Sequence, residues 1–378
     1  MPDVVSITRY VAQYRVPFHE AVRTKLTTRG IRYRVLYGAP RPGEAARQDT
    51  AAISWAEEIS STYFGPGGKL VWLSVLGKVR GADLVVISQE NALVNNYALQ
   101  FWRKFGGPRL AYFGHGKNFQ SSRPDSASER FKRLWIKQVD WWFAYTERSA
   151  RVVAGAGFPR DQTTVVNNAI DTSGIAAEVA ALDPAAQTAL RQSLFHGSQN
   201  IGVYVGGLYR EKRLGFLLDV ARLVREAVPD FHLVIMGAGP DAGIAEAAAA
   251  ELPWVHYAGP KFGAEKTALA SLGRVLLIPG VVGLGVLDSF AYGTPMVTTD
   301  IPGHGPEIEY LRHGENGLIL ADDVRTYAAA VSELLTDEAW RLQLRRGAEA
   351  ALHTFTIQAM AQRFADGILE ALTSGRQS

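Results

Sequence analysis

The sequence predicts an α/β protein made of two doubly wound parallel-sheet (Rossmann-like) domains that face each other across a cleft. The chain has 378 residues, which is too long for one ordinary hydrophobic core and suits two domains. Short apolar runs alternate with longer amphipathic segments, and this alternation starts again after residue 200. Near-continuous apolar strands separated by helices are typical of parallel sheets covered by helices on both faces.

The first half of the chain contains six predicted strands. Each run is rich in β-branched or aromatic residues and ends at polar or turn-forming residues. The strands are expected at 4–10, 32–38, 82–88, 109–114, 141–146 and 163–168, with helices between them that include 17–27 and 95–105.

The second half repeats this pattern after an Ala-rich helical segment at 175–195. An apolar stretch at 275–287 is broken by Pro279 and three glycines, so it indicates a buried strand followed by a loop. The strands are expected at 201–207, 231–237, 254–259, 274–280, 295–300 and 317–321, and the helices at 213–227, 241–251 and near 286–292.

The domain boundary is expected near residues 167–174, where a strand ends in turn-forming residues. This places the N-terminal domain at 1–171 and the C-terminal domain at 172–354. The remaining segment, 355–378, is amphipathic, and we expect a helix that crosses back to pack on the first domain. A helix packed on its own domain is the alternative.

Composition excludes several classes of protein. Hydrophobic residues make up 47% of the chain and charged residues 20%, as in globular proteins. There is no cysteine, so neither disulfides nor a Cys-based metal site is possible, which fits a reducing cytoplasm. The N-terminus lacks the pattern of a signal peptide, and no apolar stretch reaches transmembrane length. We therefore expect a cytoplasmic protein.

The two halves carry opposite charge. Residues 1–170 hold 24 Lys and Arg against 13 Asp and Glu, whereas residues 171–378 hold 16 against 24. A basic half favours an anionic partner such as lipid or a phosphorylated acceptor, and a scatter of solvated arginines is the alternative. We expect no nucleic acid, because no recognition motif is present and the positive charge is diffuse.

Loops after the second-half strands are the expected functional positions, because ligands of open parallel sheets bind at the carboxyl ends of the strands. The first such loop joins Gly206 and Gly207 to the cations Arg210, Lys212 and Arg213 at a predicted helix start. A glycine turn, a helix N-terminus and nearby cations suit a diphosphate. The spacing matches neither a P-loop nor GxGxxG, and a solvated basic face is the alternative.

Two further loops complete this predicted anion site. Gly237 and Gly239 form a second glycine turn, and Asp288 lies in the first turn of the helix that follows the broken apolar stretch. A carboxylate there accepts hydrogen bonds from vicinal hydroxyls, as on a ribose. Favourable placement of an acid at the positive end of a helix dipole is the simpler explanation, and the two are compatible.

The order of these motifs resembles the C-terminal half of the family 4 glycosyltransferases, which have the GT-B architecture. VGGLYREKRL, VIMGAGP, PGVVGLGVLDSFAYGTPMV and GPEIEYLRHGENGLIL follow one another between about 201 and 321. The first half matches more thinly, at YRVPFHEAV (14–22), FGHGKN (113–118) and 144–171. The resemblance implies transfer of a sugar from a nucleotide-sugar with retention of anomeric configuration, with acceptor binding by the first domain and donor binding by the second.

The resemblance also assigns residues to roles. His115, Arg210 and Lys212 are the predicted catalytic residues, and His304 shares a loop with the donor-side Glu307. Glu307 as an ordinary first-turn acid and His115 as a turn residue are the alternatives. Donor contacts are predicted at Gly206, Gly207, Gly237, Gly239, Pro260, Val282, Gly283, Leu284, Asp288 and Glu307. Acceptor contacts are predicted at Tyr14, Arg15, Lys117 and Asn118.

Three positions depart from the family pattern. The family keeps two acids eight residues apart, and eight residues before Asp288 stands Gly280. The second acid is an Asp in place of the usual Glu, and Gly207 replaces an arginine. No Asp-x-Asp cluster stands in a suitable loop, so we expect neither metal nor other cofactor, and protein cations should stabilise the departing diphosphate.

The expected function is therefore a glycosyltransferase of cell-surface polysaccharide or glycolipid assembly that acts on a saccharide or a lipid-linked saccharide. A basic aromatic segment at 130–145 suits a peripheral contact with the inner face of the membrane, although a helix packed into the core is slightly favoured. The alternatives are a sugar-nucleotide epimerase or hydrolase of the same fold, and a catalytically silent protein that binds glycan or nucleotide.

Overall fold

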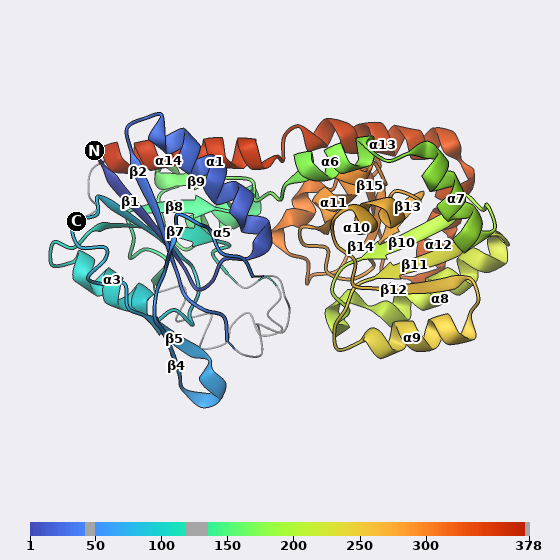
Figure 1. The fold of residues 1–378 in the computed structure, drawn as a ribbon, viewed down its shortest axis with the longest axis horizontal. Helices are drawn as coiled ribbons and strands as arrows, with labels where there is room; N and C mark the ends of the chain where they lie inside the picture. The colour runs from blue at the N-terminus through green and yellow to red at the C-terminus, as the bar shows by residue number, and fades with distance from the viewer. Residues whose placement is uncertain (42–49, 118, 120–134, 375–378) are drawn as a thin grey trace. The chain divides into compact units, whose positions relative to one another are not determined.

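The computed structural model describes residues 1–41, 50–117, 119 and 135–374. The chain divides into two compact units, Met1–Asp171 with Ile357–Ser378, and Thr172–Thr356. Both are layered α/β units built on parallel sheets (Figure 1), which confirms the predicted fold class of two Rossmann-like domains. The basic aromatic segment lies partly outside the described residues.

The first unit is built on a seven-stranded parallel sheet in the order β3-β2-β1-β6-β7-β8-β9. Its central strands are fully buried apolar runs, as a sheet covered on both faces requires. The strands are β1 (Asp3–Thr8), β2 (Arg32–Tyr37), β3 (Glu57–Glu58), β6 (Leu84–Ser88), β7 (Arg109–Gly114), β8 (Trp141–Ala144) and β9 (Thr163–Val165).

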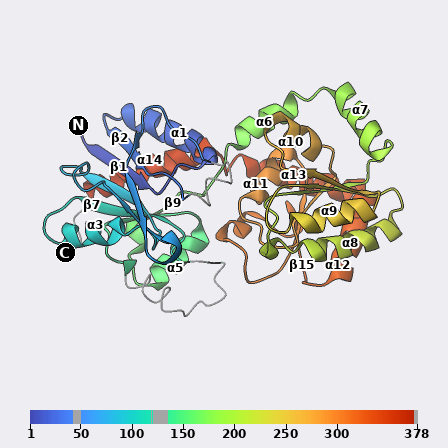
Figure 2. The ribbon, with the colours of Figure 1, turned by 60° about the horizontal axis from the view of Figure 1, so that its bottom comes forward.

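Helices of the first unit are α1 (Val16–Thr27), α3 (Asn95–Arg103), α5 (Glu147–Gly155) and the last helix of the chain, α14 (Ile357–Thr373). α14 lies beside α1 in both ribbon views (Figures 1 and 2) and packs on β8 and β9. Phe364 of α14 contacts the rings of Phe18, Phe113 and Phe143 at centroid distances of 4.3–5.4 Å. Gly367 lets the helix approach β9, because a Cβ there would lie 2.3 Å from Thr164 Oγ1.

A β-hairpin in the first unit was not predicted. β4 (Ser61–Phe64) and β5 (Leu70–Leu73) pair antiparallel around a 3-10 turn at Pro66–Gly68. The hairpin is anchored because Asn95 accepts a hydrogen bond from the Leu73 N–H at 2.7 Å and donates to the Leu73 carbonyl at 2.5 Å. The run GPGG at 65–68 was its sequence signal.

The second unit has a six-stranded parallel sheet in the order β12-β11-β10-β13-β14-β15. β10 therefore lies between β11 and β13, and the strand order reverses between β10 and β13. The strands are β10 (Ile201–Val205), β11 (His232–Met236), β12 (Val255–Gly259), β13 (Val275–Leu277), β14 (Met296–Thr299) and β15 (Gly317–Leu320). A crevice at such a reversal, outside the carboxyl ends of the strands, is where this topology binds ligands.

Helices of the second unit include several that the sequence did not specify. The single predicted segment at 175–195 is two helices, because Asp183 caps the second by accepting hydrogen bonds from the N–H groups of Ala185 and Ala186. The helices are α6 (Thr172–Ala180), α7 (Pro184–Phe195), α8 (Leu214–Ala227), α9 (Ala242–Glu251), α10 (Gly263–Ala270), α11 (Gly285–Tyr292), α12 (Val324–Thr336) and α13 (Glu338–Leu352).

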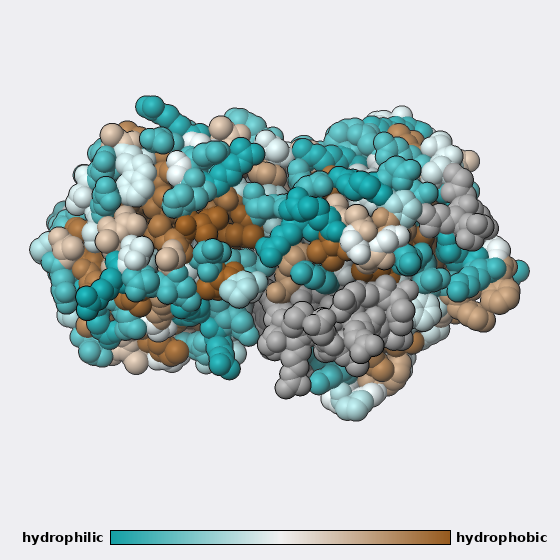
Figure 3. All heavy atoms as spheres, turned by 180° about the vertical axis from the view of Figure 1, so that it is seen from behind, coloured by the Kyte–Doolittle hydropathy of each residue, from teal (hydrophilic) through white to brown (hydrophobic). Residues whose placement is uncertain are grey.

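Most of the surface drawn in Figure 3 is hydrophilic, with smaller hydrophobic areas among the charged residues. Phe101 and Phe105 of the α3 region are an exposed apolar pair, with ring centroids 4.9 Å apart. Among the helices of the described residues, none has the length and apolar character needed to cross a membrane.

A histidine pair joins β11 to β12 near the start of both strands. Nδ1 of His232 lies 3.0 Å from Nε2 of His256, and the ring of Phe195 packs on both. Burial lowers the pKa of His232 to about 4 and also lowers the pKa of His256, with the nearby His256, Arg225 and His196 acting in the same direction on His232 and Asp230 opposing them. The folded second unit therefore favours the neutral pair.

We predict that this pair makes stability depend on pH. The folded pKa lies below the unfolded value of 6.5, so the unfolded chain binds more protons, and stability is lost as pH falls below about 6.5. The measurement is the thermal unfolding midpoint from pH 8 to pH 5. His232→Gln should reduce the slope, whereas His353→Gln, at an exposed histidine of the same unit, should not. An unchanged slope in His232→Gln would contradict the prediction.

Candidate functional site

The reversal between β10 and β13 brings two loops of the second unit together. The first loop follows β10, runs through Gly206 and forms a 3-10 helix at Arg210–Lys212 before α8 begins. Gly206 has φ of 153°, which only glycine adopts readily, and Tyr204 Oη donates to the Gly207 carbonyl at 2.7 Å. The second loop follows β13 and leads into α11.

Lys212 is the buried cation of the first loop. It is only 7% exposed, and its Nζ donates a hydrogen bond to the carbonyl of Val281 in the second loop. Burial lowers the pKa of Lys212 to about 8, and the negative charge of Asp288 opposes that shift. Burial disfavours the charged form of this lysine, and its one hydrogen-bond acceptor is neutral, so a bound anion would stabilise the charge.

Asp288 faces two lysines. It lies in the first turn of α11 with its side chain 19% exposed, and its Oδ1 is 3.7 Å from Lys266 Nζ of α10. Burial raises the pKa of Asp288, whereas Lys266 and then Lys212 oppose the rise. Lys266 was missed by the sequence reasoning, because KFGAEKTALA carries no motif and only the packing of α10 places this lysine beside the acid.

Gly280 is the point where the two loops cross. A Cβ at this position would lie 2.2 Å from the Glu211 carbonyl oxygen and 2.6 Å from Lys212 Cα. The N–H of Val281 donates to the same Glu211 carbonyl at 3.0 Å. No side chain fits there while the loops keep this contact. The acid of the family pattern is therefore replaced by a glycine that the backbone packing requires.

The two glycines of the loop after β11 serve packing. Gly237 and Gly239 have φ of 154° and 155°, and a Cβ at either would lie about 2 Å from the carbonyl oxygen of Gly206 or Leu208. Leu208 N–H also donates to the Ala238 carbonyl at 2.8 Å. These glycines let the loop after β11 pack closely on the backbone of Gly206 and Leu208.

The other predicted cations of the first loop separate. Arg210 is exposed, whereas Arg213 pairs with Asp322 at 2.6 Å. Arg213 also donates to Thr299 Oγ1 at 3.3 Å. The predicted cluster of three cations is therefore reduced to a buried Lys212 with Arg210 on the surface near it in sequence.

A buried histidine supports the second loop. His304 Nδ1 accepts from the Val282 N–H at 3.4 Å, so Nε2 carries the proton that it donates to the Thr299 carbonyl at 2.6 Å. Thr299 Oγ1 in turn donates to the Pro279 carbonyl at 2.5 Å. The structure thus gives His304 a supporting position behind the loop.

The remaining predicted donor residues differ in exposure. Glu307 is buried in the 3-10 helix at Pro306–Tyr310, and Pro260 is exposed after β12. Gly283 has φ of 57° and nothing within 4 Å of a built Cβ, so it faces open space. Leu284 directly precedes α11 and makes no side-chain capping hydrogen bond.

In the first unit, His115 lies at the carboxyl end of β7 on a loop that Gln89 holds. The Gln89 side chain accepts from the Gly116 N–H at 2.8 Å and donates to the Gly116 carbonyl at 3.1 Å. The His115 ring packs edge-on against Tyr145, with centroids 4.3 Å apart. Gln89 was missed by the sequence reasoning, although its position directly after β6 was a usable signal.

Arg15 packs on the same tyrosine. Its guanidinium carbon lies 5.2 Å from the centre of the Tyr145 ring and 5.6 Å from that of Phe113, and the residue is 9% exposed. Such cation–π packing holds a buried guanidinium. The structure therefore brings Arg15 and His115 together around Tyr145.

Tyr14 and Lys117, two further predicted acceptor residues, lie on the surface of the first unit. Tyr14 is exposed but packs on Arg15 at 5.0 Å. Lys117 and Arg148 both approach the ring of Phe119, at 4.8 and 4.9 Å. Asn118 lies outside the described residues.

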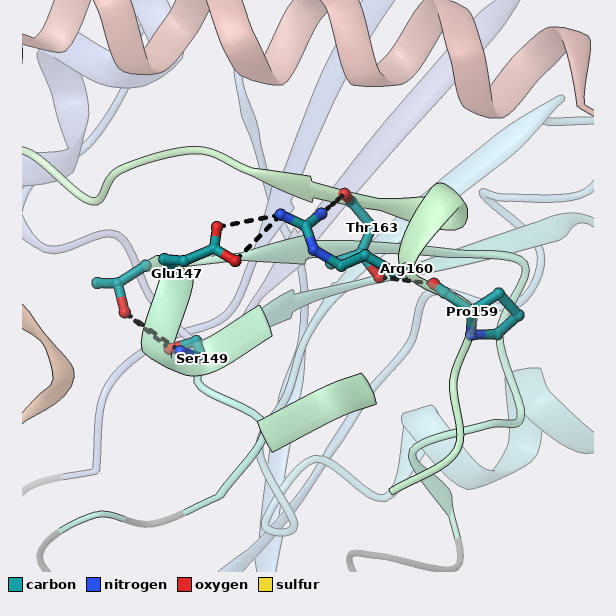
Figure 4. Close-up of polar contacts among 6 residues, drawn as sticks. Glu147, Ser149, Pro159, Arg160 and Thr163 are labelled. Carbon is teal, nitrogen blue, oxygen red and sulfur yellow. Dashed lines mark hydrogen bonds and ion pairs between the residues drawn. The ribbon is translucent and has the colours of Figure 1, made fainter. Parts of the chain in front are cut away.

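A polar cluster fixes the start of α5, directly after Tyr145 (Figure 4). Thr146 caps the helix by accepting from the Ser149 N–H at 3.2 Å. Arg160 pairs with both oxygens of Glu147 at 3.0 and 3.2 Å and donates to the Thr163 carbonyl at 2.9 Å. The pair is half-exposed and contributes little energy, but it ties α5 to β9.

Part of the second unit matches a known protein family. Residues 199–337 match the family model described as glycosyl transferases group 1. The matched region contains both loops of the crossing, with Lys212, Gly280 and Asp288.

Two curated relatives align with part of the chain. The D-rhamnosyltransferase WbpZ of Pseudomonas aeruginosa is 30% identical over 173 residues, which are 43% of this chain and 40% of WbpZ. EpsD of Bacillus subtilis is 26% identical over 244 residues, 60% of this chain and 61% of EpsD. The chain thus spans less than two thirds of either relative.

The whole chain shares its fold with solved structures. Anabaena Alr3699/HepE in complex with UDP superposes with a TM-score of 0.70 at 15% identity, covering 98% of this chain and 100% of that one. At that identity the likeness concerns the fold, which is of the GT-B type. Within the described ranges, no three His, Asp or Glu side chains are grouped as ligands for a metal ion.

We predict that Gly280→Ala destabilises the second unit by about 3 kcal/mol, because the methyl group must displace the backbone of Glu211 and Lys212. The measurement is denaturant unfolding of the purified protein. Gly303→Ala is the matched control, since its added methyl meets only Val281 Cγ2 at 3.8 Å. Equal stability of the two variants would show that the loops do not cross as described.

Proposed function

We propose that this protein is a glycosyltransferase that moves a sugar from a nucleotide-sugar to a saccharide or lipid-linked saccharide. The observation that carries the proposal is the buried Lys212 beside Asp288, at the strand reversal of a region matching the glycosyl transferases group 1 model. The match to the glycosyl transferases group 1 model and the similarity to the rhamnosyltransferase WbpZ support transfer of a sugar as the reaction.

Lys212 and the loop amides are suited to the departing diphosphate. Cleavage at the anomeric carbon builds negative charge on the leaving phosphate, and cations or N–H groups in a desolvated site stabilise that charge strongly. Lys212 supplies the cation, and the Gly207 N–H is the proposed backbone donor, since the N–H groups of Gly206 and Leu208 already donate to the Met236 and Ala238 carbonyls. Arg210 is close in sequence and exposed, so it can turn towards the diphosphate. We propose that these groups act in place of a metal ion.

Asp288 is suited to the ribose of the donor. Lys266 and Lys212 favour its ionised form although burial opposes ionisation, and an ionised carboxylate accepts hydrogen bonds from both hydroxyls of a ribose. Asp is one methylene shorter than the Glu of the family pattern, which places the ribose closer to α11. HepE was solved with UDP, and UDP is therefore the first nucleotide to test.

The first unit is the proposed acceptor domain. Its candidate contacts, His115 and Arg15, meet at Tyr145 on the carboxyl edge of the sheet. We extend the proposal to membership of glycosyltransferase family 4, to retention of anomeric configuration, and to polysaccharide or glycolipid assembly at the inner face of the membrane. The motif order supports the first two, and the basic character of residues 1–170 supports the last.

The direct test is incubation with a panel of nucleotide-sugars, with and without saccharide acceptors, followed by mass spectrometry. We expect transfer, or slow donor hydrolysis when acceptor is absent, and nuclear magnetic resonance of the product gives its anomeric configuration. An epimerised donor would replace the proposal with a sugar-nucleotide epimerase. Binding without turnover would indicate a silent binding protein.

We predict that Asp288→Asn weakens UDP binding roughly tenfold. The substitution replaces one carboxylate oxygen by an NH2 group, which donates instead of accepting, so one of the two ribose hydroxyls loses its acceptor. Isothermal titration calorimetry measures the dissociation constant. Asp322→Asn is the control, since Asp322 pairs with Arg213. Unchanged UDP affinity in Asp288→Asn would remove the ribose role.

We also predict that UDP affinity falls as pH rises through about 8. The ligand binds the protonated form of Lys212, whose pKa in the free protein is about 8, so each further rise in pH costs binding free energy. Titrations from pH 7 to 9.5 measure this. Lys212→Arg should flatten the profile, because a guanidinium stays protonated, and Lys212→Ala should lower turnover. A falling profile in Lys212→Arg would assign the titration to another group.

A further inference from the structure

The carboxylate of Asp288 has more hydrogen-bonding capacity than its contact with Lys266 uses. The Asp288 side chain is 19% exposed, and its ion pair with Lys266 is 3.7 Å long, which exceeds the ~2.7–3.2 Å of a direct hydrogen bond. A carboxylate offers two oxygens with about four lone-pair sites. A largely buried carboxylate is costly when those sites stay empty, so a ligand that donates hydrogen bonds here would be favoured.

Lys266 has unused capacity of the opposite kind. Its side chain is 25% exposed, and its Nζ lies 3.7 Å from Asp288 Oδ1 and 6.0 Å from the centre of the Tyr292 ring. A lysine ammonium carries three N–H donors and no acceptor. Neither contact is short enough for a direct hydrogen bond, so these N–H groups can donate to a ligand that lies beside the pair.

Helix packing fixes Lys266 in this place. The next residue, Thr267, is fully buried, and its Oγ1 donates to Glu178 Oε2 of α6 at 2.5 Å. α6 packs on α11 as well as on α10. The helices that carry Lys266 and Asp288 are therefore held by the same third helix, and the approach of the ammonium to the carboxylate is built into the second unit.

An acceptor beside a donor matches the two neighbouring hydroxyls of a ribose. Each hydroxyl donates one hydrogen bond and also accepts. Both hydroxyls can donate to the Asp288 oxygens while one hydroxyl oxygen accepts from Lys266. A deoxyribose lacks one of these hydroxyls, and a site with buried polar groups rejects a ligand that leaves those groups unpaired.

We propose that Lys266 contacts the ribose directly and, with Asp288, selects donors whose nucleoside keeps both the 2′- and the 3′-hydroxyl. The substrate class is then a ribonucleoside diphosphate sugar. A thymidine diphosphate sugar, which lacks the 2′-hydroxyl, is the class that the site disfavours. This inference rests on the proposed function, because it assigns a second residue to the ribose of the donor.

The test is isothermal titration calorimetry of the full chain and of Lys266→Met with UDP, 2′-deoxy-UDP and 3′-deoxy-UDP at pH 7.5. We expect the loss of either hydroxyl to weaken binding to the unmodified chain roughly tenfold. Lys266→Met should weaken UDP binding by a similar factor, but should weaken one of the deoxy nucleotides much less, because the contact is already missing there. That nucleotide identifies the hydroxyl that Lys266 contacts.

Guanosine diphosphate and its two deoxy forms are titrated in the same way, and the base that binds more tightly is analysed. Lys261→Met is the matched control, because Lys261 belongs to the same region before α10 and pairs with Glu265. It should leave all affinities unchanged. Equal losses for all three nucleotides in Lys266→Met overturn the inference, as does the absence of binding by both UDP and guanosine diphosphate.

A second titration at pH 6 separates a direct contact from an effect on the charge of Asp288. Asp288 faces Lys266 of α10, Lys212 of the first loop and Tyr292 of its own helix. Lys266 opposes the rise that burial causes in the pKa of Asp288, so Lys266→Met makes the acid less ionised at pH 6 than at pH 7.5. A loss of UDP affinity that is present at pH 6 and absent at pH 7.5 would show that Lys266 only keeps Asp288 ionised, and would overturn the inference.

Transfer assays separate this inference from the proposed function. If a sugar is transferred equally well from a UDP-sugar and from the matching 2′-deoxy-UDP-sugar, the function stands and the inference about Lys266 fails. If no transfer occurs but UDP binds with a preference over its deoxy forms that requires Lys266, the inference stands and the transferase proposal fails.

Discussion

The backbone crossing at Gly280 is the constraint on which the candidate donor site depends. The loops after β10 and β13 meet closely enough that the Val281 N–H donates to the Glu211 carbonyl and Lys212 Nζ donates to the Val281 carbonyl. This contact buries Lys212, and burial is what lowers its pKa. A cation that water does not solvate well gains more from a bound diphosphate than an exposed one does.

The rest of the second unit supports that crossing through buried polar groups with partners. Thr299 accepts from Arg213 and donates to the Pro279 carbonyl, while His304 bridges the Thr299 carbonyl and the Val282 N–H. Gly237 and Gly239 have no side chain, which lets their backbone pack directly against that of Gly206 and Leu208. Since an unpaired buried polar group is costly, these contacts hold the loops in one arrangement and leave Asp288 between Lys212 and Lys266.

The first unit also buries a cation near its proposed site, and there aromatic rings surround it. Arg15 is buried against Phe113 and Tyr145, and Tyr145 also supports His115. α14, from the end of the chain, closes the same core through Phe364. The edge that carries the proposed acceptor contacts is thus built from four loops and a helix that are far apart in the sequence.

The sequence by itself determined the α/β class, every strand of the second sheet, every strand of the first sheet except the short β3, and the loops that carry Lys212, Asp288 and His115. It did so because buried parallel strands are apolar runs and because their carboxyl ends collect polar and glycine residues. The sequence did not predict three contacts between separate segments: the pairing of β4 with β5, the hydrogen bonds of Gln89 to Gly116, and the approach of Lys266 to Asp288. Only the tertiary structure decided that Gly280 stands where no side chain fits, that Arg213 pairs with Asp322, and that Lys212 is buried. These are consequences of backbone distance and burial, which depend on how residues distant in the chain pack and leave no local pattern in it.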